Sequence, residues 1–297
     1  MTEVAPVTRP RRRAPAATAP EAIIAAMPTR RRLLIAALPA LVPGAAAWAQ
    51  QRRSMSDPLR LGVDHALFES GLVPALQRAF GRDTGIVVQL VPGAALPLLE
   101  ALERGEFDAA LTNAPEAEVR LDKQTLVHDR QPIATGDFVV VGPAPRGKGK
   151  DPAAIKGGRD AAQALIALNG AALAAPGTIT FLSAGDGSGT HVLEQALWRA
   201  AKVAPALPWY ATADAKGGLI AQARARGAYA LVERGAWLAQ GGAPLAVLVE
   251  GDPLMSQAVH VMRSFRVNHP AGKIFVAWIA GPRGRKVVAG LRGYRPV

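Results

Sequence analysis

Apolar residues along 57–297 recur with two periodicities, one of about two residues and one of three to four. These periodicities predict strands and helices, respectively. Short alternating or β-branched runs predict strands over 59–63, 85–91, 107–112 and 138–141. Between these runs, apolar residues recur every three or four positions, which predicts helices over 71–80 and 96–104 and a helix that begins at Pro115. Strands that alternate with helices predict an α/β sheet with parallel pairing.

A second set of the same kind follows the turn-rich segment 142–150, which we expect to be a hinge or boundary. Its pattern predicts a helix over 161–169, a strand over 179–182, a helix over 192–201 after a polar loop, and a helix over 217–226. A strand over 229–232, a short helix over 235–239 and a strand over 245–249 follow. The apolar run 259–262 leads back to the first set, and helices over 272–280 and 285–291 close the chain. We therefore expect lobe 1 to comprise residues 57–141 and 256–297, and lobe 2 to comprise residues 142–255. Loops at the strand ends of both lobes would border one ligand cleft.

A glycine-rich loop at 183–191 lies between a predicted strand and a predicted helix. Gly187 and Gly189 allow a tight turn, so that backbone N–H groups and the hydroxyls of Ser188 and Thr190 can converge on a small ligand at the helix N-terminus. This arrangement favours an anion. The alternative is an ordinary helix cap, in which one of the two hydroxyls accepts only from the first helical turn.

The 297 residues carry a formal net charge of +12, of which residues 1–49 contribute +5 through seven arginines and two glutamates. The remaining charge is spread without a dense block, and only 5% of residues are aromatic, so nucleic-acid binding is not predicted. The absence of cysteine excludes disulfides and thiolate metal sites. Five scattered histidines lack metal-ligand spacing, and we expect neither a metal nor a cofactor.

The N-terminal region predicts export from a bacterial cytoplasm. A basic flank at 30–32 precedes an apolar segment at 35–48, and small residues precede the polar run that begins at Gln50. We expect cleavage near Ala49 and a periplasmic protein; the consecutive arginines suit the twin-arginine route, with general secretion as the alternative. A retained membrane anchor is disfavoured because the apolar segment falls short of the ~20 residues that span a bilayer. Translation starts at Met1 or at Met27.

Several short motifs in family order resemble the extracytoplasmic solute-binding proteins of tungstate-type oxyanion transporters. The matching pieces are Glu69–Leu72, Ala114–Ala117, Gly136–Pro143, Gly185–Asp186, Ser188–His191, Gly227–Tyr229, Glu233–Gly235 and Val249–Pro253. The resemblance implies an α/β, two-lobed, type II periplasmic-binding-protein-like fold with the ligand cleft between the lobes. It also implies a monomer without a cofactor that captures a small anionic solute and delivers it to a membrane ABC permease.

The chain departs from this family at two places. The family loop carries an arginine where this chain has Ala184, and the first strand-end loop of the family carries threonines and a serine where this chain has residues 63–66. A carboxylate at Asp64 beside Asp186 would repel a dianion such as tungstate. A modified small oxyanion or an organic acid therefore fits these residues better than tungstate.

We expect eight residues to contact the ligand: Asp64, His65, Asn113, Asp186, Ser188, Gly189, Thr190 and Lys216. A protonated His65, or Lys216, would supply the missing positive charge, but both also suit an exposed loop. Asp64 could equally cap the helix that follows it, and Asn113 could be an ordinary turn residue. His191 is expected to anchor the loop rather than to touch the ligand.

The sequence bears on two other classes of function. The missing arginine motivates a scaffold that has lost transport and acts as a sensor or protein-interaction module. An enzyme is not predicted, because Ser188 and His191 lie on one short turn without a third orienting group or a nucleophile elbow.

Overall fold

The computed structural model describes residues 54–145, 149 and 151–297. The chain divides into a unit of residues 1–47, which lies outside the described residues, and a unit of residues 48–297, whose fold follows. The predicted export signal, its cleavage near Ala49 and the alternative start at Met27 also lie outside the described residues. Within the described part, no helix is both long and apolar enough to span a membrane.

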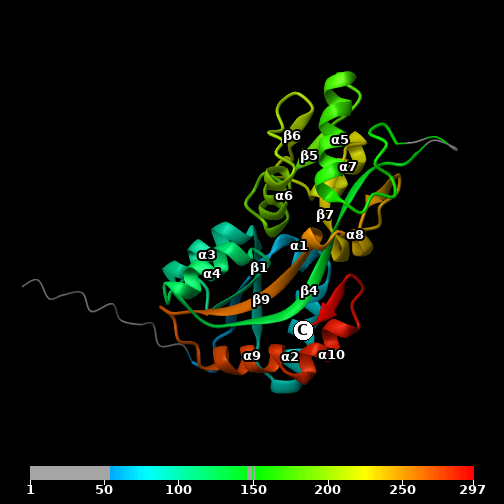
Figure 1. Cartoon of the computed structure of the whole chain (residues 1–297). Helices are drawn as coiled ribbons and strands as arrows, with labels where there is room; N and C mark the ends of the chain where they lie inside the picture. Colours follow the sequence, from blue (N-terminus) through cyan, green and yellow to red (C-terminus); the bar gives the residue numbers. More distant parts are fainter. Residues whose placement is uncertain (1–53, 146–148, 150) are drawn as a thin grey trace, which may run out of the picture. The chain divides into compact units, whose positions relative to one another are not determined.

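The largest sheet of the described residues is mixed, and its main path has the strand order β10-β4-β9-β3-β1-β2. Figure 1 labels β1, β4 and β9 of this path. Its strands are β1 (Leu59–Asp64), β2 (Val88–Gly93), β3 (Ala109–Thr112), β4 (Val127–Pro143), β9 (Ser256–Ser264) and β10 (Tyr294–Pro296). The predicted parallel pairing is confirmed where β1 pairs with β2 and β3. It is wrong for β4, β9 and β10, which pair antiparallel. Parallel neighbours need a helical crossover, as between β1, β2 and β3, whereas β9 returns from the second lobe in the opposite direction.

Strand β4 belongs to both lobes and is much longer than the predicted strand at 138–141. Its first part, 127–137, pairs with β9, and its last part, 138–143, pairs with β7 (Ala230–Glu233) and β8 (Leu245–Val249). Two register shifts interrupt the first part, which hides the alternation of apolar residues from the sequence pattern. We call the elements on the β1–β3 side lobe 1 and those on the β5–β8 side lobe 2. Limits at 141/142 and 255/256 remain our proposal for the domain boundaries.

The C-terminal strand β10 ties together the two strands that connect the lobes. The guanidinium of Arg295 donates to both carboxylate oxygens of Asp137, at 2.6 and 2.9 Å, and to the hydroxyl of Ser256 at 3.3 Å. Asp137 is the last β4 residue paired with β9, and Ser256 is the first residue of β9. The ion pair therefore lies where the chain crosses between the lobes.

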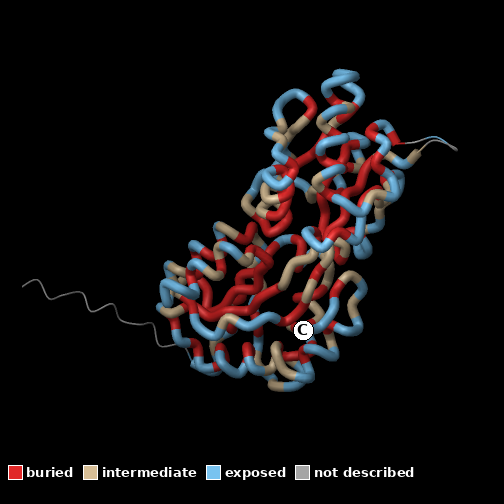
Figure 2. The backbone as a smooth tube through the Cα atoms, viewed as in Figure 1, coloured by how far each residue is buried: buried red, intermediate tan, exposed pale blue. Residues whose placement is uncertain are grey.

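Lobe 1 packs helices on both sides of its strands (Figure 1). Its helices are α1 (His65–Glu69), α2 (Leu72–Thr84), α3 (Ala95–Arg104), α4 (Pro115–Lys123), α9 (Pro270–Ala280) and α10 (Pro282–Ala289). Helices α2, α9 and α10 share one core with β1, in which the Phe80 ring meets Phe275 edge-on at 5.1 Å. Helices α3 and α4 share a second core on the other side. Figure 2 shows the strands as the buried interior between these helices.

Lobe 2 is built on β5 (Phe181–Ser183), β6 (Tyr210–Thr212), β7 and β8. Its helices are α5 (Ala161–Ala174), α6 (Gly189–Ala200), α7 (Leu219–Arg226) and α8 (Arg234–Gln240). Strands β5 and β6 pair in parallel, and the ring of Phe181 contacts Trp198 and Tyr210. The predicted helices of both lobes are present within a few residues of their expected bounds. The short elements α1, β6 and β10 were not predicted, because three to five residues carry too little periodicity.

We predict that Tyr229→Phe destabilises the protein by ~1–3 kcal/mol, because it removes two buried hydrogen bonds. The Tyr229 hydroxyl donates to Asp151 Oδ2 and accepts from the Ala153 N–H, each at 2.9 Å. Its loss leaves the buried Ala153 N–H unpaired and leaves Asp151 Oδ2 with only the longer bond from the Ile155 N–H, at 3.3 Å. Urea unfolding followed by circular dichroism measures the change. An unchanged midpoint at an unchanged slope would contradict the prediction.

Candidate functional site

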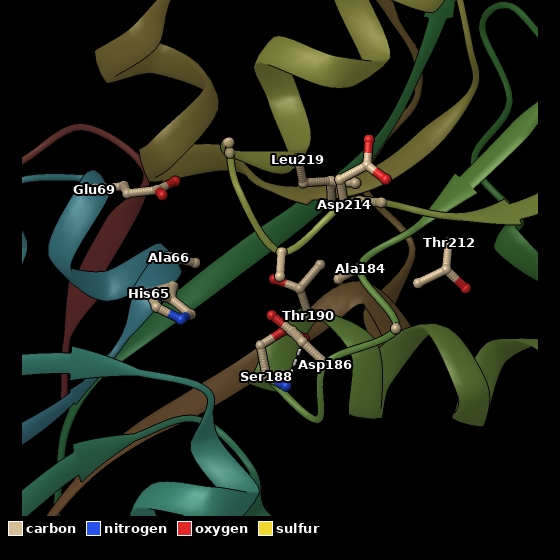
Figure 3. A pocket seen from close by; sticks show the side chains of 15 residues that line it. His65, Ala66, Glu69, Ala184, Asp186, Ser188, Thr190, Thr212, Asp214 and Leu219 are labelled. Carbon is tan, nitrogen blue, oxygen red and sulfur yellow. Dashed lines mark hydrogen bonds between the residues drawn. The ribbon is translucent and has the colours of Figure 1, made fainter.

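The loops that follow β1, β5 and β6 border a cavity of about 490 Å³. It is lined by His65, Ala66, Glu69, Ala184, Gly185, Asp186, Ser188, Thr190, Thr212, Ala213, Asp214, Ala215, Gly217, Gly218 and Leu219. Figure 3 shows His65 and Glu69 projecting from α1 on one side, with Ser188 and Thr190 on the other. The cavity thus lies between α1 of lobe 1 and the loops of lobe 2, as the strand-end arrangement predicts.

The loop before α6 satisfies most of its own backbone donors. The N–H of Gly187, which has a φ of +80°, donates to His191 Nδ1 at 3.0 Å, and the N–H of Ser188 donates to Asp186 Oδ1 at 2.8 Å. Ser188 is the N-cap of α6, and its hydroxyl oxygen accepts from the His191 N–H at 3.3 Å. The predicted anchoring role of His191 is confirmed, and Ser188 acts as a helix cap.

Asp64 joins the two lobes from behind the cavity wall. Its Oδ1 accepts from the Ala66 N–H and caps α1, and its Oδ2 accepts from the Gly189 N–H at the start of α6, each at 3.0 Å. The capping alternative for Asp64 is thereby confirmed. Burial raises the pKa of this carboxyl to about 6, although both N–H donors and His65 act to lower it. The carboxylate is completely buried and does not line the cavity.

Asn113 is held against the start of α6 by a buried network. A Cβ on Gly189 would collide with the Asn113 amide, so the two residues are in direct contact. On either side of Asn113, the Thr112 hydroxyl and the Ala114 N–H donate to Glu118 Oε1 at 2.7 and 2.9 Å. The other oxygen of Glu118 lies 3.0 Å from an Arg130 nitrogen and 2.8 Å from His260 Nδ1. Asn113 itself is buried, and neither amide atom has a hydrogen-bond partner among the described residues.

The structure brings most of the expected ligand residues to one place. His65, Asp186, Ser188 and Thr190 line the cavity. Asp64, Asn113 and Gly189 lie behind its wall, in contact with one another through Gly189. Lys216 is exposed and does not line the cavity, although its neighbours Ala215 and Gly217 do.

Glu69, Thr212 and Asp214 line the cavity but were not predicted. Glu69 lies four residues after His65, so both fall on one face of α1, and this spacing is a signal that would have found it. Thr212 ends β6, a three-residue strand without a usable pattern. Asp214 pairs with Arg226 on α7 at 2.8 Å, a contact that local sequence does not reveal.

The cavity is rich in carboxylates and poor in fixed positive charge. Glu69, Asp186 and Asp214 line it, and no lysine or arginine is present among the described residues that do so. The side-chain hydrogen-bond donors that line it include the hydroxyls of Ser188, Thr190 and Thr212 and the imidazole of His65. The cavity therefore combines hydroxyl donors with acidic neighbours. We expected this composition from Ala184, which replaces an arginine, and from the carboxylate of Asp64.

Ser188 and His191 do not form a nucleophile–base pair. Ser188 Oγ accepts from the backbone N–H of His191, while the ring of His191 accepts from Gly187, so the two side chains are not paired with each other. Among residues 54–145, 149 and 151–297, no cluster of three or more His, Asp or Glu side chains could hold a metal ion.

A profile of the family described as "PBP superfamily domain" matches residues 57–283. The chain belongs to this superfamily. It is similar to the tungstate-binding protein TupA of Peptoclostridium acidaminophilum, at 27% identity over 229 residues that cover 74% of this chain and 76% of the relative.

Two solved structures share the fold of this PBP-superfamily chain. One is the tungstate ABC transporter protein of Geobacter sulfurreducens, with a TM-score of 0.68 and 28% identity over 80% of this chain and 100% of that one. The other is the tungstate-binding protein TupA of Desulfovibrio alaskensis G20, with a TM-score of 0.62 and 27% identity over 81% and 99%. The predicted α/β, two-lobed binding-protein fold and the resemblance to tungstate-type proteins are confirmed.

In this PBP-superfamily chain, a second buried carboxyl lies near Asp64. Glu233 ends β7, and burial together with the charges of Asp64 and Glu69 raises its pKa to about 8, while the nearby hydroxyl of Tyr294 acts in the opposite direction. The native state therefore keeps its proton at pH values where the unfolded chain has lost it. This contribution to stability is complete below about pH 4.5, the ordinary value for Glu, and is lost as pH rises to about 8.

We predict that Glu233→Gln, which keeps the shape but cannot ionise, removes this pH dependence. At about pH 9 the variant should unfold at least ~2–4 °C above the wild type, the shift that 1 kcal/mol produces in a domain of this size. At about pH 5 the difference should shrink, because the wild-type carboxyl is then protonated in the native state. Thermal unfolding at both pH values measures it, with the exposed Glu100→Gln as control. Equal differences at both pH values would contradict the assignment.

Proposed function

We propose that this protein is an exported, monomeric solute-binding protein that captures a small anionic solute, either an oxyanion or an organic acid, and delivers it to a membrane ABC permease. It works in the periplasm without a cofactor and catalyses no reaction. The relatives named above are tungstate-binding proteins and a tungstate ABC transporter protein, which supports an anion as the solute class.

The observation that carries the proposal is the cavity at the start of α6. Thr190, only 5% exposed, lines it with a hydroxyl that is not used by the N-cap, and His65 faces it from α1 (Figure 3). Hydroxyl and imidazole donors near the positive end of a helix dipole favour an anionic group. Its volume of about 490 Å³ also lies in the range of pockets that hold small organic molecules, which supports an organic acid as well as a hydrated oxyanion.

Bonds between the lobes support capture by closure. Besides the bond from Gly189 to Asp64, the Leu96 N–H donates to the Gly187 carbonyl at 3.0 Å. The Gln240 amide donates to Glu69 Oε2 at 2.8 Å. Glu69 also lines the cavity, so this bond links the ligand wall to α8. Such contacts would form as the lobes close around a solute, and a permease would recognise the closed pair.

A second candidate is a scaffold that acts as a sensor or a protein-interaction module. It is favoured by the loop before α6, where within the described residues four of the five N–H groups from Gly187 to His191 have acceptors inside the chain. A loop whose N–H groups are bonded within the protein does not need a ligand to be stable. Genes for a permease and an ATPase beside the gene for this protein would favour transport, and a signalling gene in their place would favour the sensor.

Titration calorimetry of the purified mature protein tests the proposal. We expect saturable binding of at least one member of a panel of tungstate, molybdate, sulfate, phosphate and small organic acids. Binding to none of them would overturn the anion-capture function and favour the sensor.

We predict that Thr190→Val, which keeps the shape but removes the hydroxyl, weakens binding of the best solute by ~1–3 kcal/mol, or about 5- to 150-fold in Kd. Thr178→Val is the matched control, because Thr178 is exposed and donates only to the Ala175 carbonyl after α5. Equal affinities of the two variants would show that the Thr190 hydroxyl does not contact the solute.

A further inference from the structure

We infer that Asp64 sets the charge of the solute: its carboxylate is a built-in anion at the N-terminus of α6, and it selects solutes with at most one negative charge over dianions. This inference rests on the proposed function and narrows its solute class. Asp64 acts as a specificity-determining residue from behind the cavity wall, without lining it.

The first observation is that the chain itself fills the anion position at this helix end. The N–H of Gly189, the first residue of α6, donates to Asp64 Oδ2 at 3.0 Å. The neighbouring N–H groups of Ser188 and His191 have acceptors in Asp186 and in the cap hydroxyl. A helix N-terminus stabilises a negative charge only within its first turn. The carboxylate of Asp64 therefore occupies the N–H donor and the positive end of the helix dipole that a solute anion would otherwise use.

A second and independent observation is the unpaired amide of Asn113. This side chain is 1% exposed, contacts Gly189, and has no hydrogen-bond partner for Oδ1 or Nδ2 within the described residues. A buried unpaired amide is costly, and here it abuts the same helix start as Asp64. The amide thus adds an unused polar group to the helix start whose Gly189 N–H is already taken by Asp64, which marks this end of α6 as the polar side of the site.

The other carboxylates around the cavity also disfavour a solute with two negative charges. Asp186, Asp214 and Glu69 line it, and their fields add to that of Asp64 in repelling each further negative charge of a solute. His65, the first residue of α1, acts in the opposite direction on the pKa of Asp64. A monoanion loses half as much to this repulsion as a dianion of the same size, while both gain hydrogen bonds from the same donors.

The groups that face Asp64 leave it ionised at neutral pH. Burial and Asp186 raise its pKa, the Gly189 and Ala66 N–H groups and His65 lower it, and the result is about 6. Glu233 and Tyr294 also interact with its charge from β7 and β10. At about pH 7.5 most molecules therefore carry the carboxylate, which makes this the condition for the test.

The test compares tungstate, a dianion, with perrhenate, a tetrahedral monoanion of nearly the same size, by titration calorimetry of the full-length mature protein at about pH 7.5. Asp64→Asn keeps a good helix cap for α1 but removes the charge and frees the Gly189 N–H. We expect Asp64→Asn to raise the affinity for tungstate relative to perrhenate by about tenfold or more.

Two further variants serve as controls. Asp122→Asn removes one charge from the exposed end of α4, away from the cavity, and should leave the ratio of the two affinities unchanged. Asp64→Ser retains a capping oxygen but is too short to reach Gly189, and should shift the ratio in the same direction as Asp64→Asn. Thermal unfolding checks that each variant is folded.

The outcomes separate this inference from the proposed function. An unchanged ratio in folded Asp64→Asn and Asp64→Ser, or no binding of either anion to them, overturns the role of Asp64. Binding of the wild type to another anion would then leave the proposed function standing. If the wild type binds no anion and Asp64→Asn gains tungstate binding, the inference holds and the proposed function of the wild type fails.

Discussion

The bond from the Gly189 N–H to the Asp64 carboxylate is the constraint on which the site depends. It joins residues 125 positions apart, fixes the start of α6 against the end of β1, and places a buried charge beside the cavity. Because the same carboxylate caps α1, the helix that carries His65 and Glu69 is held by the same group. The positions of both cavity walls thus follow from one aspartate.

The sequence predicted those helices and strands whose hydrophobic pattern is complete within the element itself. Long amphipathic helices such as α2 and the β-branched strand β8 have patterns that need no partner to be recognised. A local pattern does not reveal whether two strands pair parallel or antiparallel, because this depends on the path of the chain between them. Strand β9 enters the sheet after the whole of lobe 2 and pairs antiparallel to β4. Strand β4 was only partly predicted for a related reason: its register shifts break the alternation.

The candidate site was predicted only in part, because several of its contacts join residues that are far apart in the chain. The glycine-rich loop, Thr190 and His65 were recognisable because each shows its chemistry within a few residues. Asp64 was singled out, but the sequence left open whether it faces a ligand or caps a helix, and its bond to Gly189 is a tertiary contact. Asn113 likewise depends on Glu118, whose carboxylate receives donors from three separate segments.

The bonds of Arg295 to Asp137 and Ser256 give β10 a structural role at the junction of the lobes. Two adjacent strands, β4 and β9, carry the chain between the lobes, and they pair with each other up to Asp137 and Ser256. Here the fastener is a forked ion pair supplied by β10, far along the chain from the cavity. The junction between the lobes is therefore fastened in part by β10, so the junction and the solute site are encoded in separate parts of the sequence.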